Sequence, residues 1–225
     1  MTKKVIVLSL IILLFINSSC TKYDIEDEQH IDTKALAIEN IQTDLNVINI
    51  KADLGLLDSM MNHCDENIKI DALFSYYSQK ESLIEDKKIE LKIKGSSTVY
   101  YPLKSLMVKF KKKVKNSSTP ILEIDELLPW HSIDELKKIS LRNSGNDFYG
   151  TLIKDISFTD LAIQLGLDLE LSYHQPVHVF LNNSYYGLLN IRTEKDDNSL
   201  GKLLGVDNDD VNILKISHTG ERQEN

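Results

Sequence analysis

The chain has 225 residues, of which 42% are hydrophobic and 27% charged, and its formal net charge at neutral pH is −8. This length and composition are typical of one globular domain with a sizeable core, and there is no internal repeat. The acidic balance disfavours nucleic acid and anionic lipid headgroups as partners, because both would repel the chain.

The first twenty residues are typical of an export signal. Lys3 and Lys4 precede the apolar run Val5 to Ile16, which is too short to span a bilayer as a mature helix, and small residues then lead to Cys20. A cysteine at this junction resembles the acylation site of bacterial lipoproteins, in which the thiol becomes the lipidated N-terminus. We expect a signal peptide over residues 1–19 and a lipid anchor at Cys20; an ordinary signal peptide with a chance cysteine is the alternative.

Residues 20–44 are interpreted as an acidic tether that ends in a short helix over Asp32 to Gln42. Removal of the signal peptide takes the formal charge to −10, because that segment holds two lysines and no acid. A similar acidic stretch directs some Gram-negative lipoproteins to the cell surface. We therefore expect an exported protein, held by its lipid at the outer membrane or the cell surface of a Gram-negative bacterium. Cys64 is then left without a partner for an internal disulfide.

The first elements of the domain carry clear local signals. The segment Asn46 to Ile50 predicts a strand. Asp53 is a suitable cap for the helix that follows, because apolar residues recur at helical spacing between Leu54 and Met61.

Three alternating segments come next and predict an antiparallel meander. They are Ile68–Tyr77, Lys88–Lys94 and Leu106–Phe110. We expect a charged connection over Ser78 to Asp86 and a solvated turn over Lys111 to Ser118.

The second half predicts a strand over Ile139 to Asn143 and a long helix over Thr151 to Leu165, with Gly166 as its C-terminal cap. The apolar residues of this helix are expected to face the core. They are Leu152, Ile153, Ile156, Leu161, Ala162 and Leu165.

The end of the chain predicts a hairpin, a helix and a last strand. The hairpin joins Pro176–Leu181 to Tyr185–Arg192 through an Asn-Asn-Ser turn. Asp197 or Asn198 would cap a helix that ends at Gly205, and Val211 to Ile216 would be the last strand. The whole pattern predicts an α+β fold, a mostly antiparallel sheet with a few packed helices, over residues 45–216, followed by a polar tail over 217–225.

Two groups of residues suggest metal ligands but favour other interpretations. His174 and His178 lie four apart without a third ligand nearby, so we expect surface histidines. Asp207 to Asp210 lacks the glycine and the terminal glutamate of an EF-hand loop, so we expect a turn after the preceding helix. No metal site is predicted.

Three segments, in order, resemble the CotH kinase family, atypical protein kinases of spore coats and bacterial surface lipoproteins. The segments are Ile93–Thr98 with Pro102–Ser105, Ser140–Asp147 with Ile153–Asp155, and Pro176–Leu188. The resemblance covers residues 45–216 and implies the N-terminal half of the family's fold.

Several positions depart from the family's pattern. Lys94 replaces an arginine, Ser96 an asparagine, and Leu103 one of two paired lysines. Thr193 stands where many members carry glutamate, and Glu194 follows one place later. Because neighbouring residues of a strand face opposite sides, Glu194 is not expected to substitute.

The resemblance also implies a nucleotide site that uses ATP and Mg²⁺. In it, Lys104 would be a phosphate-binding cation oriented by Asp155, and Lys154 would match a family arginine. Arg142 would face the site, and the Gly95-Ser96-Ser97 turn would offer backbone N–H groups to a phosphate. Without the resemblance, each of these residues would be interpreted as an ordinary surface or capping residue.

The family's catalytic and metal-binding carboxylates belong to a segment that would follow Ile216, and only nine residues come after it. We therefore expect a truncated, kinase-like lipoprotein that acts as a binding or remnant module; its catalytic residues stay unassigned. A half-fold would expose an apolar sheet face, where a protein partner could bind. The alternative is an active ATP-dependent Ser/Thr protein kinase.

Overall fold

A computed structural model describes residues 43–78, 81–111, 137–167, 172, 174–216 and 222–224. The expected signal peptide, Cys20, the tether and the helix of residues 32–42 lie outside these ranges, as does most of the turn expected over Lys111 to Ser118. Within the described ranges, none of the helices has both the length and the apolar character needed to cross a bilayer.

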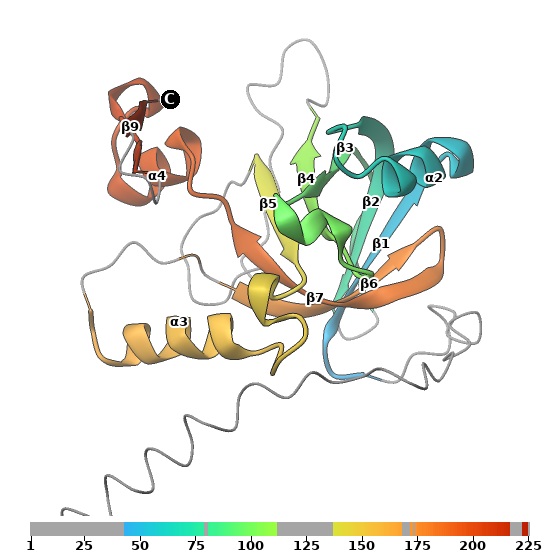
Figure 1. The fold of residues 1–225 in the computed structure, drawn as a ribbon, viewed down its shortest axis with the longest axis horizontal. Helices are drawn as coiled ribbons and strands as arrows, with labels where there is room; N and C mark the ends of the chain where they lie inside the picture. Colours follow the sequence, from blue (N-terminus) through green and yellow to red (C-terminus); the bar gives the residue numbers. More distant parts are fainter. Residues whose placement is uncertain are drawn as a thin grey trace, which may run out of the picture. The chain divides into compact units, whose positions relative to one another are not determined.

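Seven strands close into a barrel in the order β1-β2-β3-β4-β5-β7-β6 (Figure 1). The strands are β1 (Asn46–Ala52), β2 (Lys69–Ser78), β3 (Glu81–Lys94), β4 (Ser105–Phe110), β5 (Lys138–Arg142), β6 (His174–Leu181) and β7 (Ser184–Thr193). Every neighbouring pair is antiparallel except β1 and β6, whose parallel pairing closes the barrel. The predicted α+β fold with a mostly antiparallel sheet is confirmed.

Three α-helices and a small sheet complete the described part of the chain. The helices are α2 (Leu54–Asn62), α3 (Lys154–Gln164) and α4 (Asp197–Leu204). Three short 3-10 helices are η3 (Ser97–Tyr100), η4 (Gly145–Asp147) and η5 (Asn208–Asp210), and η5 lies at the turn expected after α4. Near the end, β8 (Leu214–Ile216) forms within the strand expected over Val211 to Ile216. It pairs with β9 (Arg222–Glu224), which lies in the segment expected as a polar tail.

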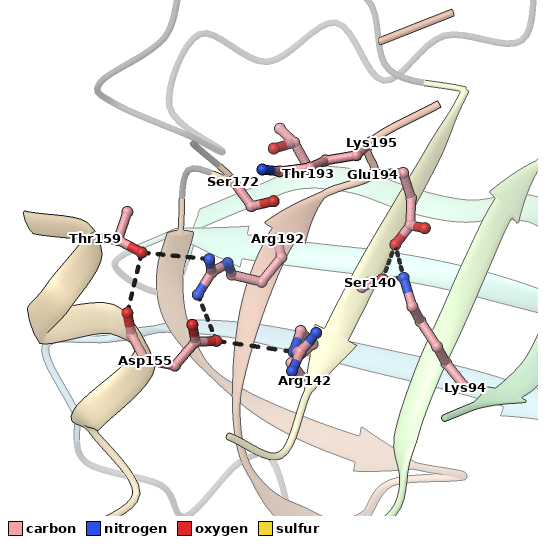
Figure 2. Close-up of a pocket in the computed structure, with 10 residues that line it drawn as sticks. All are labelled: Lys94, Ser140, Arg142, Asp155, Thr159, Ser172, Arg192, Thr193, Glu194 and Lys195. Carbon is pink, nitrogen blue, oxygen red and sulfur yellow. Dashed lines mark hydrogen bonds and ion pairs between the residues drawn. The ribbon is translucent and has the colours of Figure 1, made fainter. Parts of the chain in front are cut away.

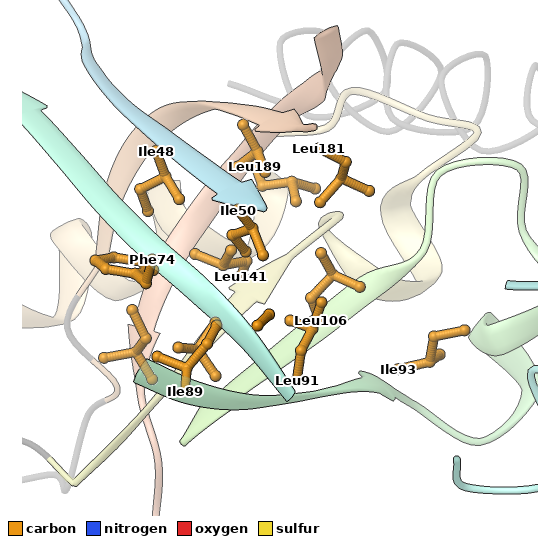
Figure 3. Close-up of a cluster of buried hydrophobic side chains, with 14 of the residues drawn as sticks. Ile48, Ile50, Phe74, Ile89, Leu91, Ile93, Leu106, Leu141, Leu181 and Leu189 are labelled. Carbon is orange, nitrogen blue, oxygen red and sulfur yellow. The ribbon is translucent and has the colours of Figure 1, made fainter. Parts of the chain in front are cut away.

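Alternate side chains of the strands fill the interior of the barrel. In β2 the predicted apolar face is buried, with Phe74 and Tyr76 fully covered. The Phe74 ring meets Phe110 of β4 edge to face, with 5.3 Å between the ring centroids. Figure 3 shows how aliphatic side chains from several strands, among them Ile50 and Leu141, converge on the same space. The alternation leaves the opposite faces of the strands pointing outward.

Local signals at the ends of elements are confirmed. Asp53 caps α2 by accepting a hydrogen bond from the backbone N–H of Leu56 (3.0 Å). Asn182 and Asn183 both have positive φ in the turn between β6 and β7, as the tight hairpin requires. Gly166 has a φ of +62° at the end of α3.

The charged connection expected over Ser78 to Asp86 is wrong for the residues described there. Strand β2 continues to Ser78 and β3 begins at Glu81, so the two strands form one long hairpin. The Asp86 backbone N–H donates to the Ser75 hydroxyl (3.1 Å), and Lys51 pairs with the Asp86 carboxylate (3.1 Å). Charged residues indicate exposure to water, but they do not exclude a strand. A hairpin can be exposed to water and still keep the backbone hydrogen bonds between its two strands.

Helix α3 forms as predicted, but of the apolar residues expected to face the core only Ala162 is buried. Leu161 and Leu165 are 48% and 63% exposed, whereas Thr159 and Ala162 are the buried residues of the helix. Helical spacing shows which residues share a face, but it does not show which face meets the rest of the protein. Here the neighbouring surface is polar, so the polar face of the helix turns inward.

The cap of α4 also differs from the expectation. Asp196, rather than Asp197 or Asn198, accepts the backbone N–H of Ser199 (2.9 Å). The same carboxylate pairs with Lys138 of β5 (2.8 Å), which joins the start of α4 to the barrel.

Candidate phosphate-binding site

The candidate site lies on the outer face of β5 and β7. Ser140 lies opposite Arg192 in the register of these strands, and Leu141 lies opposite Ile191. Because Leu141 and Ile191 point into the barrel, Ser140 and Arg192 point outward. Arg142 shares this outward face, since it lies two residues beyond Ser140.

Arg192 is the most deeply buried cation of the site, with 6% of its surface exposed. Its guanidinium donates to the Asp155 carboxylate of α3 (3.0 Å) and to the Thr159 hydroxyl (3.5 Å) (Figure 2). Thr159 in turn donates to the backbone carbonyl of Asp155 (3.0 Å). Burial lowers the pKa of Arg192, while the nearby Asp155 charge opposes that shift.

Two guanidinium groups share one carboxylate at this site. The Nε atom of Arg142 lies 4.0 Å from the same Asp155 oxygen that pairs with Arg192. The Nε atoms of both arginines are buried and have no hydrogen-bond partner in the part of the chain that the structure describes. A buried cationic donor without a partner is costly, and the two like charges repel. The pair is therefore complementary to one more anion.

A second polar cluster lies beside the arginines. Glu194 accepts hydrogen bonds from both Lys94 and Ser140, and Lys94 donates to the Ser140 hydroxyl (2.7 Å). Glu194 directly follows the end of β7, so the alternation of that strand no longer fixes the direction of its side chain. Glu194 therefore lines the same cavity as Thr193, although strand alternation alone would turn it to the opposite side.

These residues enclose an open cavity of about 530 Å³. Its lining residues are Lys94, Ser140, Arg142, Asp155, Thr159, Ser172, Arg192, Thr193, Glu194 and Lys195. Four of these side chains are cationic and two are carboxylates, which leaves an excess of two positive charges.

A smaller cavity of about 290 Å³ adjoins the first, and both are lined by Lys94 and Arg142. The turn Gly95 to Ser97 lines the smaller cavity, as do Gly145 and Asn146. The structure thus brings the predicted glycine-serine turn and the predicted Arg142 together.

Two glycines of the smaller cavity have backbone conformations that residues with a side chain rarely adopt. Gly95 has a φ of +138°, and a Cβ there would lie 2.4 Å from the Thr98 hydroxyl. Gly145 has a φ of +59°, and a Cβ there would lie 2.8 Å from the Arg142 guanidinium. The absence of a side chain at Gly145 therefore leaves room for the Arg142 guanidinium.

Two predicted site residues do not line these cavities. The Lys104 ammonium donates to the backbone carbonyls of Val99 (2.7 Å) and Tyr101 (3.1 Å), so it closes the turn around η3. Lys154 is exposed and begins α3, and its backbone N–H donates to Asp147 (3.0 Å).

The predicted pairing of Lys104 with Asp155 is replaced by another. Within the described residues, the ion-pair partners of Asp155 are Arg192 and Arg142. The cation of the sheet that Asp155 orients is Arg192 and not the predicted Lys104. Sequence reasoning missed Arg192 because this residue was interpreted as the polar end of an alternating strand. The signal that could have identified it is an arginine on the outward side of a strand that ends beside the site.

The two histidines of β6 are not the surface residues that we expected. His174 is buried and its Nε2 lies 2.9 Å from the Asp160 carboxylate, which links β6 to α3. His178 is half-buried and contacts the hydroxyls of Tyr185 and Thr43, each at 3.1 Å. Among the described residues there is no group of three side chains suited to hold a metal ion.

Comparison with protein families finds one family model that matches more than half of the chain. The family model for the CotH kinase protein matches residues 91–225. The matched region includes Lys94, Arg142, Asp155, Arg192 and Glu194, which form the two polar clusters of the site. Comparison with curated protein sequences finds no match.

Proposed function

The chain belongs to the CotH kinase family, and on that premise we propose that the cavity beside Arg142 and Arg192 binds the phosphate groups of a nucleotide, ATP in this family. The proposal assigns phosphate binding to the described part of the chain. It makes this part a binding module of kinase type on an exported lipoprotein.

One observation carries the proposal, namely that two guanidinium groups, the buried one of Arg192 and the partly exposed one of Arg142, share the single carboxylate of Asp155. Each of these arginines keeps a buried Nε–H without a partner in the described part of the chain. Phosphate oxygens accept two parallel hydrogen bonds from one guanidinium, and a triphosphate carries enough negative charge for two. Lys94 and the glycine-serine turn line the adjoining smaller cavity together with Arg142.

The family uses Mg²⁺ with ATP, but the described residues fit the phosphates better than the metal. Asp155 and Glu194 are the acidic side chains of the larger cavity, and both are already engaged by cations. When bound, Mg²⁺ would neutralise phosphate charge. The described residues would contribute binding and orientation of the phosphates.

The test is equilibrium dialysis of the full chain, purified in detergent, against radiolabelled ATP. We expect Arg192→Gln and Arg142→Gln each to weaken binding roughly tenfold or more, since a hydrogen bond to a charged group contributes about 1.5–3 kcal/mol. Lys109→Gln is the matched control, because Lys109 is an exposed cation of β4 away from the cavity. The proposal would be refuted if all three variants bound ATP with the affinity of the wild type and had melting temperatures like that of the wild type.

A second candidate function is phosphate transfer to Ser or Thr of a protein. It is favoured by the helix–strand ion pair between Asp155 and Arg192, which resembles the acid–cation pair that positions phosphates in protein kinases. Incubation with Mg²⁺ and ATP labelled on the terminal phosphate decides between the two functions. Transfer of label that is lost in Arg192→Gln would support a kinase, whereas binding without transfer supports the module.

We further propose that the chain is exported and lipidated at Cys20; the support is the sequence of the first twenty residues. Metabolic labelling with a radioactive fatty acid tests this proposal. We expect Cys20→Ala to lose the label and to leave the membrane fraction, and Cys64→Ala to keep both. Digestion of intact cells with protease then shows whether the protein is displayed on the cell surface. Label retained by Cys20→Ala would contradict the proposal.

A further inference from the structure

A separate cavity lies where the chain enters the barrel. It has a volume of about 280 Å³ and shares no lining residue with the two cavities of the phosphate site. Its lining includes Asp44, Leu45 and Asn46 from the start of the described chain, Pro176 of β6 and Asp160 of α3. The cavity therefore lies between the entry of the chain into β1, the beginning of β6 and the middle of α3.

One face of α3 adjoins this cavity and is rich in isoleucine. Ile156, Asp160 and Ile163 are four and three residues apart, so their side chains share one face of the helix. Ile153, three residues before Ile156, continues the same row. Ile153 and Ile163 are 56% and 36% exposed. Because Asp160 lines the cavity, this isoleucine face (Ile153, Ile156 and Ile163) is directed toward the place where the chain enters the barrel.

The segment of residues 33–42 joins the described chain at this place. It ends directly before Thr43, whose hydroxyl contacts His178 of β6 (3.1 Å) and accepts the backbone N–H of Leu45 (3.0 Å). These contacts hold the chain beside the cavity. A helix over residues 33–42 would be roughly 15 Å long, which matches the 11 residues of α3.

The sequence of this segment suits an apolar surface. In the helix that the sequence predicts there, Ile38 and Ile41 lie three residues apart and share a face, with Ala37 beside them. Two helices with apolar stripes of this kind pack against each other. No linker separates the segment from the domain, so its effective concentration at α3 is far above that of a separate protein. This favours the chain's own segment over another partner.

We propose that residues 33–42 form a helix that docks on the isoleucine face of α3, beside the cavity at Asp160. The docked segment adds apolar contacts to a helix whose described links to β6 and β7 are polar. It also braces the helix that carries Asp155, the partner of Arg192. The inference goes beyond phosphate binding and does not depend on it.

The first test is disulfide crosslinking within the full chain, purified in detergent. Cys20→Ser and Cys64→Ser remove the two native thiols. Ile38→Cys is then combined in turn with Ile156→Cys, Ile163→Cys or Leu161→Cys, and the oxidised proteins are compared by mass spectrometry and by mobility without reductant. Leu161 is the matched control, because it is 48% exposed on the other flank of the same helix.

We expect a crosslink within one chain for Ile38→Cys with Ile156→Cys or with Ile163→Cys, according to the direction in which the segment runs, and none with Leu161→Cys. Three outcomes would overturn the proposal. They are no crosslink to either isoleucine position, an equal yield with Leu161→Cys, and crosslinks only between two chains, which would make a second copy the occupant of the isoleucine face.

The second test measures whether the segment and the isoleucine face stabilise each other. We expect Ile38→Gln and Ile163→Gln each to lower the melting temperature by at least about 4 °C, because each removes a buried apolar contact. The double variant should melt little below the lower of the two, since both substitutions break the same contact. Fully additive shifts, or no shift for Ile38→Gln, would refute the docking.

Discussion

At the scale of single residues, the site depends on where two arginine side chains are held. Asp155 and Thr159 fix Arg192, and the space above Gly145 admits the Arg142 guanidinium. Neither arginine has its Nε–H paired within the described residues, and the side chain of Arg142 is 40% exposed beside the cavity. The affinity of the site should therefore change when the position of either guanidinium changes, even if its charge is kept.

Gly145→Ala tests this dependence without removing a charge. A Cβ at Gly145 would collide with the Arg142 guanidinium, so we expect ATP affinity to fall severalfold. The positive φ of +59° adds a cost of about 1 kcal/mol in folding free energy. Titration calorimetry gives the affinity, and urea unfolding gives the stability.

Gly166→Ala is the control for backbone strain. Its φ of +62° is nearly the same, but a Cβ there would have no neighbour within 4 Å. We expect it to lose similar stability and to bind ATP like the wild type. A similar loss of affinity in both variants would show that strain, and not the displacement of Arg142, weakens binding.

Sequence reasoning at this scale succeeded where a residue's role is local. The cap at Asp53 and the turn at Asn182 and Asn183 follow from the preferences of those side chains. Arg192 could not be found in the same way, because its partner Asp155 lies on a different element, 37 positions earlier in the chain. A resemblance to a family directed attention to Lys104, whose ammonium closes a local turn.

At the scale of elements, α3 is attached to the barrel through its polar face. Its described links to β6 and β7 are Asp155 and Thr159 with Arg192, and Asp160 with His174. The exposed apolar residues lie on the rest of its surface. The stability that α3 gains from the barrel should therefore depend on these polar contacts more than on its leucines.

Substitutions on the two faces of α3 test this arrangement. We expect Thr159→Val to cost about 1 kcal/mol of unfolding free energy, because it removes buried hydrogen bonds while it keeps the shape of the side chain. We expect Leu161→Gln to change that free energy by no more than about 0.5 kcal/mol, since Leu161 is 48% exposed. Both values come from urea denaturation followed by circular dichroism. A larger cost for Leu161→Gln than for Thr159→Val would mean that the apolar face is buried after all.

The helix also shows where periodicity stops being informative. The spacing predicted a helix over Thr151 to Leu165, and a helix forms over Lys154 to Gln164. The orientation was wrong because it depends on the polarity of the strands beneath, and those strands are polar on their outer side. Similarly, the charge of Ser78 to Asp86 concealed the extension of β2 and β3.

At the scale of the whole molecule, the barrel closes where β1 meets β6. The pairing joins residues 46–50 to residues 177–181, and no local pattern marks which strands become neighbours at such a separation. The sequence therefore predicted the strands and their antiparallel meander but not the closed barrel. His178 lies at this closure, opposite Val47, and contacts Thr43 and Tyr185.

His178, at the closure of the barrel, should make the free energy of unfolding depend on pH. Burial lowers the pKa of His178 below its ordinary value of 6.5, so between that value and its folded pKa the unfolded chain binds a proton that the native chain does not. The contribution of His178 to stability is therefore complete above about pH 6.5 and is lost as the pH falls toward the folded pKa. We expect the melting temperature to decline over this range, and His178→Gln to make the decline shallower. An unchanged slope in that variant would show that His178 does not contribute.

The most direct test of the central claim is a crystal structure of the chain grown with ATP. The account predicts phosphate oxygens within hydrogen-bond distance of the Arg142 and Arg192 guanidinium groups, on the outer face of β5 and β7. Phosphates bound elsewhere in the molecule, with both arginines still paired only to Asp155, would contradict it.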